Sequence, residues 1–421
     1  MKKKFKLSWL EGRFKGVYKW LYPGIGIKRW IGMVGLGVIL VAFGFSYLSF
    51  EEYWVTKILD VILLISGIII LVLGIRRINR SLISAFIPSS RSDEILDILY
   101  HRRQIGRGPK IVAIGGGTGL SVLLNGLKEY TSNITAIVTV ADDGGSSGRL
   151  RQQFDILPPG DIRNCLVALA DAPALMRDLF QFRFEQGSEL AGHSFGNLFI
   201  TAMTRLTGDF EKAVKETSKV LALRGQVLPS TLNNVLLVAE HQDGSVTEGE
   251  GKIPQAHKPI RKVFLKPAAP SATPEAIKAI EEAQIIVLGP GSLYTSILPN
   301  LLIKEITDTI VASGAIKVYV CNVMTQPGET DGYKASDHIK AIISHSHPRV
   351  LDYCVVNLGE FPKEILKRYA KENSYPVTSD PENIKNMGYR IIEDDIILSD
   401  GLVRHDPVKL TRIIVGFLEE I

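Results

Sequence analysis

Two long apolar segments near the N-terminus constrain the fold of this chain more than any other feature. Ile31–Phe50 has no charged residue, and Ile58–Ile75 has only Asp60. A helix of about 20 apolar residues is long enough to cross the hydrocarbon core of a bilayer. The two segments raise the mean hydropathy to +0.14, which is high for a soluble chain. The sequence therefore predicts two transmembrane helices and excludes a simple soluble enzyme, a disordered chain and a small disulfide-built scaffold.

The distribution of charge predicts how this pair of helices lies in the membrane. Residues 1–30 carry a net charge of +8 and residues 76–110 carry +5, whereas the short connection from Glu51 to Lys57 is acidic. By the positive-inside rule both termini lie in the cytoplasm, with a hairpin at residues 31–75 and the main domain on the cytoplasmic side of the cell membrane. A cleaved signal peptide is the competing interpretation of the first segment. The length of the apolar run, the missing small-residue cleavage pattern and the second segment argue against it.

The regions on either side of the hairpin are basic. Residues 1–30 interleave aromatic residues with lysines, which fits either a segment at the lipid headgroups or an ordinary basic flank. Residues 76–108 are predicted as a juxtamembrane linker with one short helix near Ser92–Tyr100. The three cysteines are scattered and form no C-x-x-C pair, so we expect a reducing cytoplasm and neither zinc nor disulfides.

Residues 109–421 are predicted to form the globular part, which has room for one large sheet or for two lobes. Short apolar runs alternate with helical stretches, which is typical of a Rossmann-like α/β fold with a mostly parallel, doubly wound sheet. Val235–Leu265, with a turn at Asp243-Gly244, predicts a small antiparallel excursion. The predicted strands are Ile111–Ile114, Thr135–Val140, Ile285–Leu288, Val318–Val323 and Tyr353–Val356, and the predicted helices lie near Leu120–Tyr130, Pro274–Ala283, Ser336–Ser344, Pro362–Glu372 and Pro407–Glu420.

The first chemical motif is a glycine-rich turn between a strand and a helix, Gly115-Gly116-Gly117-Thr118-Gly119-Leu120. Glycines at this position let backbone N–H groups approach a phosphate, and the helix dipole favours an anion. The pattern is not the G-x-G-x-x-G fingerprint, because the third glycine would fall on Leu120, and no Gly-Lys-Ser/Thr follows to make a Walker loop. A tight strand–helix turn without a ligand is the alternative.

The second strand ends in a pair of carboxylates, Asp142 and Asp143, followed by small residues and then Arg149 and Arg151. At the carboxyl edge of a nucleotide-binding sheet, such carboxylates hold a ribose hydroxyl or a divalent ion such as Mg²⁺ beside phosphates. The arginines are suited to bidentate contacts with phosphate oxygens. A solvated turn with a helix cap is the alternative.

Four further polar clusters follow along the chain. They are Pro159–Asn164, Ala191–Asn197, Leu288–Ser296 and Cys321–Asp331. The third repeats the strand-to-glycine-loop pattern, so a second phosphate or a sugar is expected there. By itself His193 fits a hydrogen-bonded histidine better than a catalytic base. The candidate ligand-binding residues in these clusters are Asn164, His193, Asn197, Gly291, Ser292 and Tyr294.

Taken in order, the motifs resemble those of the YvcK/CofD-like family, on the YvcK branch. They read G-G-G-T-G-L-S, V-A-D-D-G-G-S-S-G-R-L-R, P-P-G-D-I-R-N, A-G-H-S-F-G-N, G-P-G-S-L-Y-T-S and N-V-M-T-Q-P-G-E-T-D, and the resemblance spans Pro109 to Ile421. It implies a gluconeogenesis-linked factor that binds UDP-N-acetylglucosamine and governs cell shape and wall growth. The CofD branch is similar to 2-phospho-lactate transferases of deazaflavin cofactor synthesis. The membrane hairpin departs from the usual soluble form of the YvcK branch.

The resemblance also implies roles for individual residues. It assigns phosphate or nucleotide contacts to Gly116–Gly119, and places Asp142, Asp143 and Asn164 facing the ligand. In the C-terminal part it implies a tyrosine and an arginine at the nucleotide-sugar site, Tyr369 and Arg404. A tyrosine ring can stack on uracil and an arginine can pair with a diphosphate.

The sequence supports two candidate functions for the chain. The first is a membrane-anchored cytoplasmic nucleotide-sugar sensor that requires no cofactor and acts on cell-wall or metabolic proteins. The second is a CofD-type transferase in which Asp142 and Asp143 hold Mg²⁺. A nicotinamide-dependent oxidoreductase is disfavoured by the broken glycine fingerprint, and nucleic-acid binding by the net charge of −6 on residues 111–421. The number of copies that assemble stays open.

Overall fold

The computed structural model describes residues 27–48, 54–86, 105–185, 187, 189–400 and 402–418. The chain divides into two compact units, Met1–His101 and Arg102–Ile421. The basic aromatic segment up to residue 26, residues 51–53 of the acidic connection and the predicted helix at Ser92–Tyr100 lie outside the described residues.

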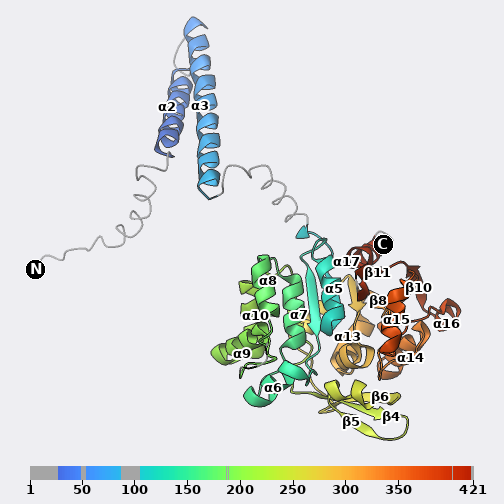
Figure 1. Cartoon of the computed structure of the whole chain (residues 1–421). Helices are drawn as coiled ribbons and strands as arrows, with labels where there is room; N and C mark the ends of the chain where they lie inside the picture. The colour runs from blue at the N-terminus through green and yellow to red at the C-terminus, as the bar shows by residue number, and fades with distance from the viewer. Residues whose placement is uncertain are drawn as a thin grey trace, which may run out of the picture. The chain divides into compact units, whose positions relative to one another are not determined.

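The N-terminal unit contains two apolar helices, α2 (Ile27–Leu48) and α3 (Trp54–Phe86), which lie side by side (Figure 1). Both include stretches long and apolar enough to cross a membrane, Arg29–Ser46 and Lys57–Asn79. Helix α3 continues past Ile75 to Phe86, into the region predicted as linker, because no proline or glycine interrupts the chain between Gly74 and Pro88. Two apolar helices are thus present where two spans were predicted.

Glycines bring the two helices into close contact. A Cβ atom on Gly37 would lie 2.8 Å from the backbone nitrogen of Leu71, and one on Gly67 would lie 2.8 Å from that of Val41. Gly44 and Gly74 make equally close approaches one heptad further along each helix. Small residues of this kind let helix backbones approach in an apolar environment, where packing rather than the hydrophobic effect drives association.

The C-terminal unit contains one seven-stranded sheet in which every neighbouring pair is parallel, in the order β10-β9-β8-β7-β1-β2-β3. Winding runs from β1 to one edge and then from β7 to the other, so right-handed crossovers put helices on both faces. This confirms the predicted doubly wound α/β fold as one sheet. The strands are β1 (Ile111–Gly115), β2 (Ile134–Val138), β3 (Gln226–Pro229), β7 (Ile285–Leu288), β8 (Ile316–Val320), β9 (Tyr353–Asn357) and β10 (Arg390–Asp394).

The helices between these strands follow the sequence expectation in part. The five predicted helices are present, with ends shifted by a few residues, as α5 (Gly117–Leu127), α11 (Pro274–Glu281), α14 (Ala335–His345), α15 (Lys363–Lys371) and α17 (Pro407–Gly416). The other helices, mostly between β2 and β3, were not predicted. They are α6 (Gly145–Phe154), α7 (Gly160–Leu169), α8 (Ala174–Gln181), α9 (Phe195–Thr207), α10 (Phe210–Val220), α12 (Leu298–Leu301), α13 (Lys304–Ala312) and α16 (Pro381–Asn386).

Two small antiparallel sheets complete the unit. The predicted excursion is confirmed as a three-stranded sheet of β4 (Leu236–His241), β5 (Val246–Glu248) and β6 (Ile260–Lys266), with Gly244 at a positive φ of 82° in the turn. A hairpin of β11 (Ile397–Asp400) and β12 (Leu402–His405) was not predicted. It packs through Ile397 and Val403 on Val323 and Met324, in a small core separate from the main one.

The close packing of α5 against α17 gives a test of the fold. A Cβ atom on Gly126 would overlap the carbonyl oxygen of Pro407, so we expect Gly126→Ala to lower the free energy of unfolding by about 1–3 kcal/mol. Gly416→Ala, in open space on α17, should be neutral or stabilise by up to about 1 kcal/mol. Urea denaturation of residues 102–421 measures both, and equal effects would contradict this packing.

Candidate functional site

The turn from β1 into α5 presents the N-terminus of a helix at the carboxyl edge of the sheet. Gly117, the first residue of α5, has a φ of 66°, which favours glycine. A side chain on Gly116 would collide with the Asp161 carboxylate. Gly116, the N-cap residue, has no side chain to cap this helix, and the buried Asp161 carboxylate accepts a hydrogen bond from the Gly117 N–H. The next N–H groups of the first turn have no partner within the helix. Such a helix end can bind a phosphate.

A second glycine loop follows β7, the neighbour of β1 in the sheet. Gly289 and Gly291 have φ values of 77° and 156°, and the chain then enters a π-helical turn at Leu293–Ile297. The two loops touch, since a Cβ atom on Gly119 would lie 2.7 Å from the Pro290 carbonyl oxygen. They stand where the winding of the sheet reverses, which is the usual ligand position in open α/β sheets.

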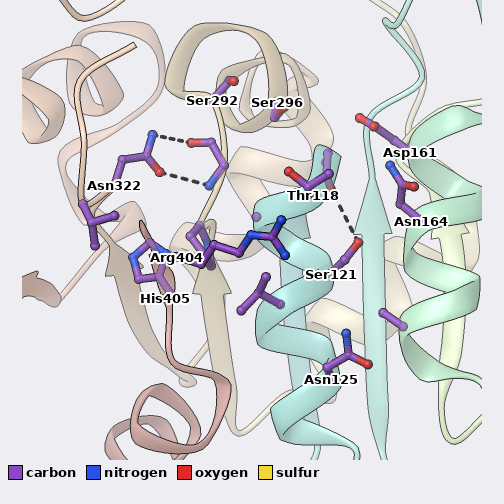
Figure 2. Close-up of a pocket in the computed structure, with 18 of the residues that line it drawn as sticks. Thr118, Ser121, Asn125, Asp161, Asn164, Ser292, Ser296, Asn322, Arg404 and His405 are labelled. Carbon is purple, nitrogen blue, oxygen red and sulfur yellow. Dashed lines mark hydrogen bonds between the residues drawn. The ribbon is translucent and has the colours of Figure 1, made fainter. Parts of the chain in front are cut away.

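Asn322, just after β8, holds the second loop in place. Its side-chain oxygen accepts a hydrogen bond from the Gly291 N–H at 3.2 Å, and its nitrogen donates to the Gly291 carbonyl at 2.8 Å (Figure 2). Gln326 donates to the Ser292 hydroxyl at 2.5 Å. The segment after β8 therefore fixes the loop backbone and exposes Ser292 to the cavity.

A cavity of about 840 Å³ opens over the two loops, which is within the usual range for small-molecule sites. Its wall combines the first turns of α5 with parts of α7, α8, α15 and β12. Nine of the predicted residues line it: Gly116, Gly117, Thr118, Gly119, Asn164, Gly291, Ser292, Tyr369 and Arg404. Residues separated by almost 290 positions in the sequence thus share one wall.

Tyr369 and Arg404 reach the cavity from the C-terminal part of the chain. The Tyr369 hydroxyl accepts a hydrogen bond from the Val403 N–H at 3.2 Å, which ties α15 to β12. The Arg404 side chain extends toward α5 (Figure 2). His405 donates through Nε2 to the Cys321 carbonyl at 3.1 Å, and burial lowers its pKa to about 4. His405 is therefore neutral at physiological pH and donates this hydrogen bond.

Six predicted residues lie away from the cavity wall, because their side chains are engaged elsewhere. Tyr294 is buried and shares a 2.7 Å hydrogen bond with Tyr333, and Arg149 donates to the Ala191 carbonyl at 2.8 Å. His193 and Asn197 are buried, and both contact the Ser146 hydroxyl, at 3.0 Å and 3.1 Å. Asp142 and Asp143 complete this group.

The A-G-H-S-F-G-N motif lies outside the cavity wall and supports a residue that lines it. Ser194 accepts a 2.6 Å hydrogen bond from Arg163, whose other terminal nitrogen donates to the Asn164 side-chain oxygen at 2.6 Å. Burial, with Arg149 and Arg183 nearby, lowers the pKa of His193, which favours the neutral ring that shares a hydrogen bond with the Ser146 hydroxyl. The motif therefore positions Asn164 instead of lining the cavity itself.

The carboxylates of Asp142 and Asp143 accept hydrogen bonds from backbone N–H groups. Asp142 accepts from the Gly144 N–H and Asp143 from the Gly251 N–H, each at 2.9 Å. Three other acids, none of them among the predicted site residues, line the cavity: Asp161, Asp178 and Glu250. Burial, with Asp142 close by, raises the pKa of Asp161 to about 7 and that of Glu250 to about 8. No spacing rule marks Glu250, which comes from the antiparallel excursion.

The described side chains around the cavity do not form a metal site by themselves. In the described parts of the chain, no three His, Cys, Asp or Glu side chains are grouped to hold a metal ion. The carboxylates of Asp142 and Asp143 are each bound to an N–H group. A Mg²⁺ ion at this edge would need ligand phosphate oxygens to complete its shell.

The buried Glu329 gives a pH test of the packing behind the second loop. Burial raises its pKa from 4.5 to about 7, so between these values the folded chain binds more protons than the unfolded chain. Its contribution to stability is therefore complete below pH 4.5 and lost as the pH rises through 7. We expect Glu329→Gln to remove this loss, worth about 3 kcal/mol by about pH 8.

Denaturation of wild type and Glu329→Gln across the pH range measures this difference. Glu382→Gln, on an exposed side chain, is the control and should track wild type. If the free energies of unfolding of wild type and Glu329→Gln changed in parallel with pH, the raised pKa of Glu329 would be contradicted.

Comparisons with known proteins identify relatives along most of the chain. Residues 111–397 match the family model described as 2-phospho-L-lactate transferase CofD. A putative gluconeogenesis factor of Nostoc sp. is 49% identical over 94% of this chain and 92% of its own length, and one of Clostridium acetobutylicum is 45% identical over 94% and 90%. Matches of this length extend into the N-terminal helices, so a chain with this region is not peculiar to this protein.

Other relatives match about three quarters of this chain over almost their whole length. The gluconeogenesis factor of Bacillus subtilis is 52% identical over 317 residues, 75% of this chain and 100% of its own. The crystal structure of protein BH3568 from Bacillus halodurans superposes with a TM-score of 0.72 at 50% identity, covering 73% of this chain and all of that one. This chain therefore belongs to the CofD family, in the YvcK branch whose members are named gluconeogenesis factors.

Proposed function

We propose that this protein is a membrane-anchored cytoplasmic factor that binds UDP-N-acetylglucosamine or a similar nucleotide sugar. The observation that carries the proposal is one cavity in which the N-terminus of α5, two glycine loops, Arg404 and Tyr369 converge. The helix end and loop N–H groups bind the diphosphate and Arg404 pairs with it. Tyr369 supplies a flat ring for the base.

Binding in this proposal does not require catalysis. The one hydroxyl–imidazole pair discussed above, Ser146 with His193, is buried outside the cavity wall. The bound state would be passed to cell-wall or metabolic proteins, and so regulate cell shape, wall synthesis and gluconeogenic growth. The names of the relatives support the link to gluconeogenesis.

The second candidate is a Mg²⁺-dependent transferase of the 2-phospho-L-lactate type, which the description of the matching family supports. Asp161 and Glu250 favour it as well, since acids beside a phosphate cradle repel the ligand unless a cation or protons intervene. Asp142 and Asp143 would hold the ion, which would act as a Lewis acid on the phosphate. The residues of the chain would orient the two substrates.

The proposed location is the cell membrane, with α2 and α3 as the two spans and both termini in the cytoplasm. The support is their length and apolar composition, together with the basic flanks at residues 1–30 and 76–110. The nucleotide-sugar site would then face the cytoplasm, where nucleotide-activated sugars would reach it directly. A homo-oligomer is compatible with this arrangement, and nucleic acid is not expected as a partner.

The central prediction concerns affinity for the nucleotide sugar. Titration calorimetry with UDP-N-acetylglucosamine should show saturable binding without product, and EDTA should leave it unchanged. Arg404→Ala should weaken binding about 10- to 100-fold, because a charged hydrogen bond to a phosphate contributes about 1.5–3 kcal/mol.

The control is Arg412→Ala, which removes an exposed arginine of α17 and should bind as wild type does. Absence of binding would refute the proposal. Binding followed by product formation, lost in Asp142→Asn and Asp143→Asn variants that keep their fold, would instead support the transferase.

The topology has a separate test. Protease added to sealed, right-side-out cells should leave the C-terminal unit intact, because the positive-inside rule puts it in the cytoplasm. The same protease should cleave it once the cells are permeabilised. Cleavage in sealed cells would show that the domain is outside.

A further inference from the structure

The cavity has two sides, because α5 runs between them. Ser121 and Asn125 point from α5 toward α7, where Asn164 lies, whereas Arg404, His405 and Asn322 approach α5 from the other side (Figure 2). Helix α5 packs against α7 on the first side and contacts β12 on the second. A ligand whose phosphates sit at the N-terminus of α5 therefore extends to both sides.

The two sides differ in chemistry. The side toward β12, here called the base side, is lined by Val323, Met324, Tyr369 and Val403 together with Arg404. The side toward α7 and α8, here called the sugar side, is lined by polar side chains, Ser121, Asn125, Asn164, Arg177, Asp178 and Gln181. Apolar groups with one aromatic ring suit a planar heterocycle. Amides, a hydroxyl and a carboxylate suit a ring covered with hydroxyl groups, since each can donate or accept hydrogen bonds.

Local structure prepares the sugar side for this role. Thr118, Ser121 and Asn125 recur at intervals of three and four residues, so they form a polar stripe on α5 opposite the buried leucines of the same helix. Ser121 donates back to the Gly117 carbonyl at 3.2 Å, which leaves Asn125 as the longer, exposed side chain of the stripe.

Asn164 faces this stripe in a fixed orientation. Arg163 donates to its side-chain oxygen at 2.6 Å and is itself held by Ser194. The side-chain nitrogen, a donor, is therefore the group left free to face α5 and the cavity (Figure 2). Val167 and Ala168, one helical turn further along α7, add a small apolar surface to the same side. An acetamido group, with one N–H, one carbonyl and one methyl, matches these neighbours.

We propose that Asn125 and Asn164 are specificity-determining residues that recognise the sugar of the bound nucleotide sugar, on the opposite side of α5 from the base. This inference rests on the proposed function. It adds the orientation of the ligand, with the sugar toward α7 and the base toward β12. It separates residues that contact the sugar from residues that contact the nucleotide, so variants on the two sides must respond differently to UDP and to UDP-N-acetylglucosamine.

The experiment compares these two ligands on the full-length chain in lipid nanodiscs by titration calorimetry. Asn125→Leu and Asn164→Leu should each weaken UDP-N-acetylglucosamine about 5- to 10-fold, the effect of losing one neutral hydrogen bond, and leave UDP within about twofold of wild type. Tyr369→Ala should weaken both ligands by a similar factor. Asn386→Leu, on an exposed asparagine of α16, is the matched control and should change neither.

Melting temperatures of all variants check that the fold is kept. The inference is overturned if the Asn125 and Asn164 variants weaken both ligands equally or weaken neither, or if Tyr369→Ala affects only the sugar-bearing ligand. These outcomes leave the proposed function standing, because wild type still binds. Wild type that binds neither ligand would refute the proposed function and this inference with it.

Discussion

The contact between the two glycine loops at the centre of the sheet is the constraint on which the rest of the site depends. Gly119 of the first loop lies against the Pro290 carbonyl of the second, with no space for a side chain between them. The contact exists because β1 and β7 are adjacent in the sheet although their sequences are far apart. It brings the N-terminus of α5 and the Ser292 hydroxyl of the second loop to the wall of one cavity, so a single anionic group can contact both.

The surrounding elements hold this point rigid. Asn322 fixes the second loop, while the Ser194–Arg163–Asn164 chain fixes the wall on the side of α7. The chemistry of a binding site depends on such support, because a polar group adds most to affinity when its orientation is already fixed before the ligand binds. This explains how His193 and Asn197 can belong to a motif of the site without lining its cavity: they join α6 to α9 through Ser146.

Much of the fold follows from sequence patterns that are local. Fully apolar runs such as Ile111–Ile114 and Ile285–Leu288 become buried central strands of the parallel sheet. The two edge strands, β3 and β10, escaped prediction for a physical reason. β3 is only four residues long and ends in Pro229, and β10 has just two apolar residues, Ile391 and Ile392, between charged ones, as partly exposed edges do. Helix α6 between β2 and β3 was hidden by its first four residues, two glycines and two serines, which are weaker helix formers than alanine.

The sequence by itself determined the two apolar helices, the α/β alternation and both glycine loops, because each depends on neighbouring residues and on backbone preferences. It also singled out nine residues that line the cavity. Only the tertiary structure decided which polar residues line that cavity and which support the lining residues through hydrogen bonds. Asp161 and Glu250 line it, while Asp143 is bound to the Gly251 N–H, because burial and contacts depend on how distant segments pack. Long-range packing leaves no local pattern in the chain.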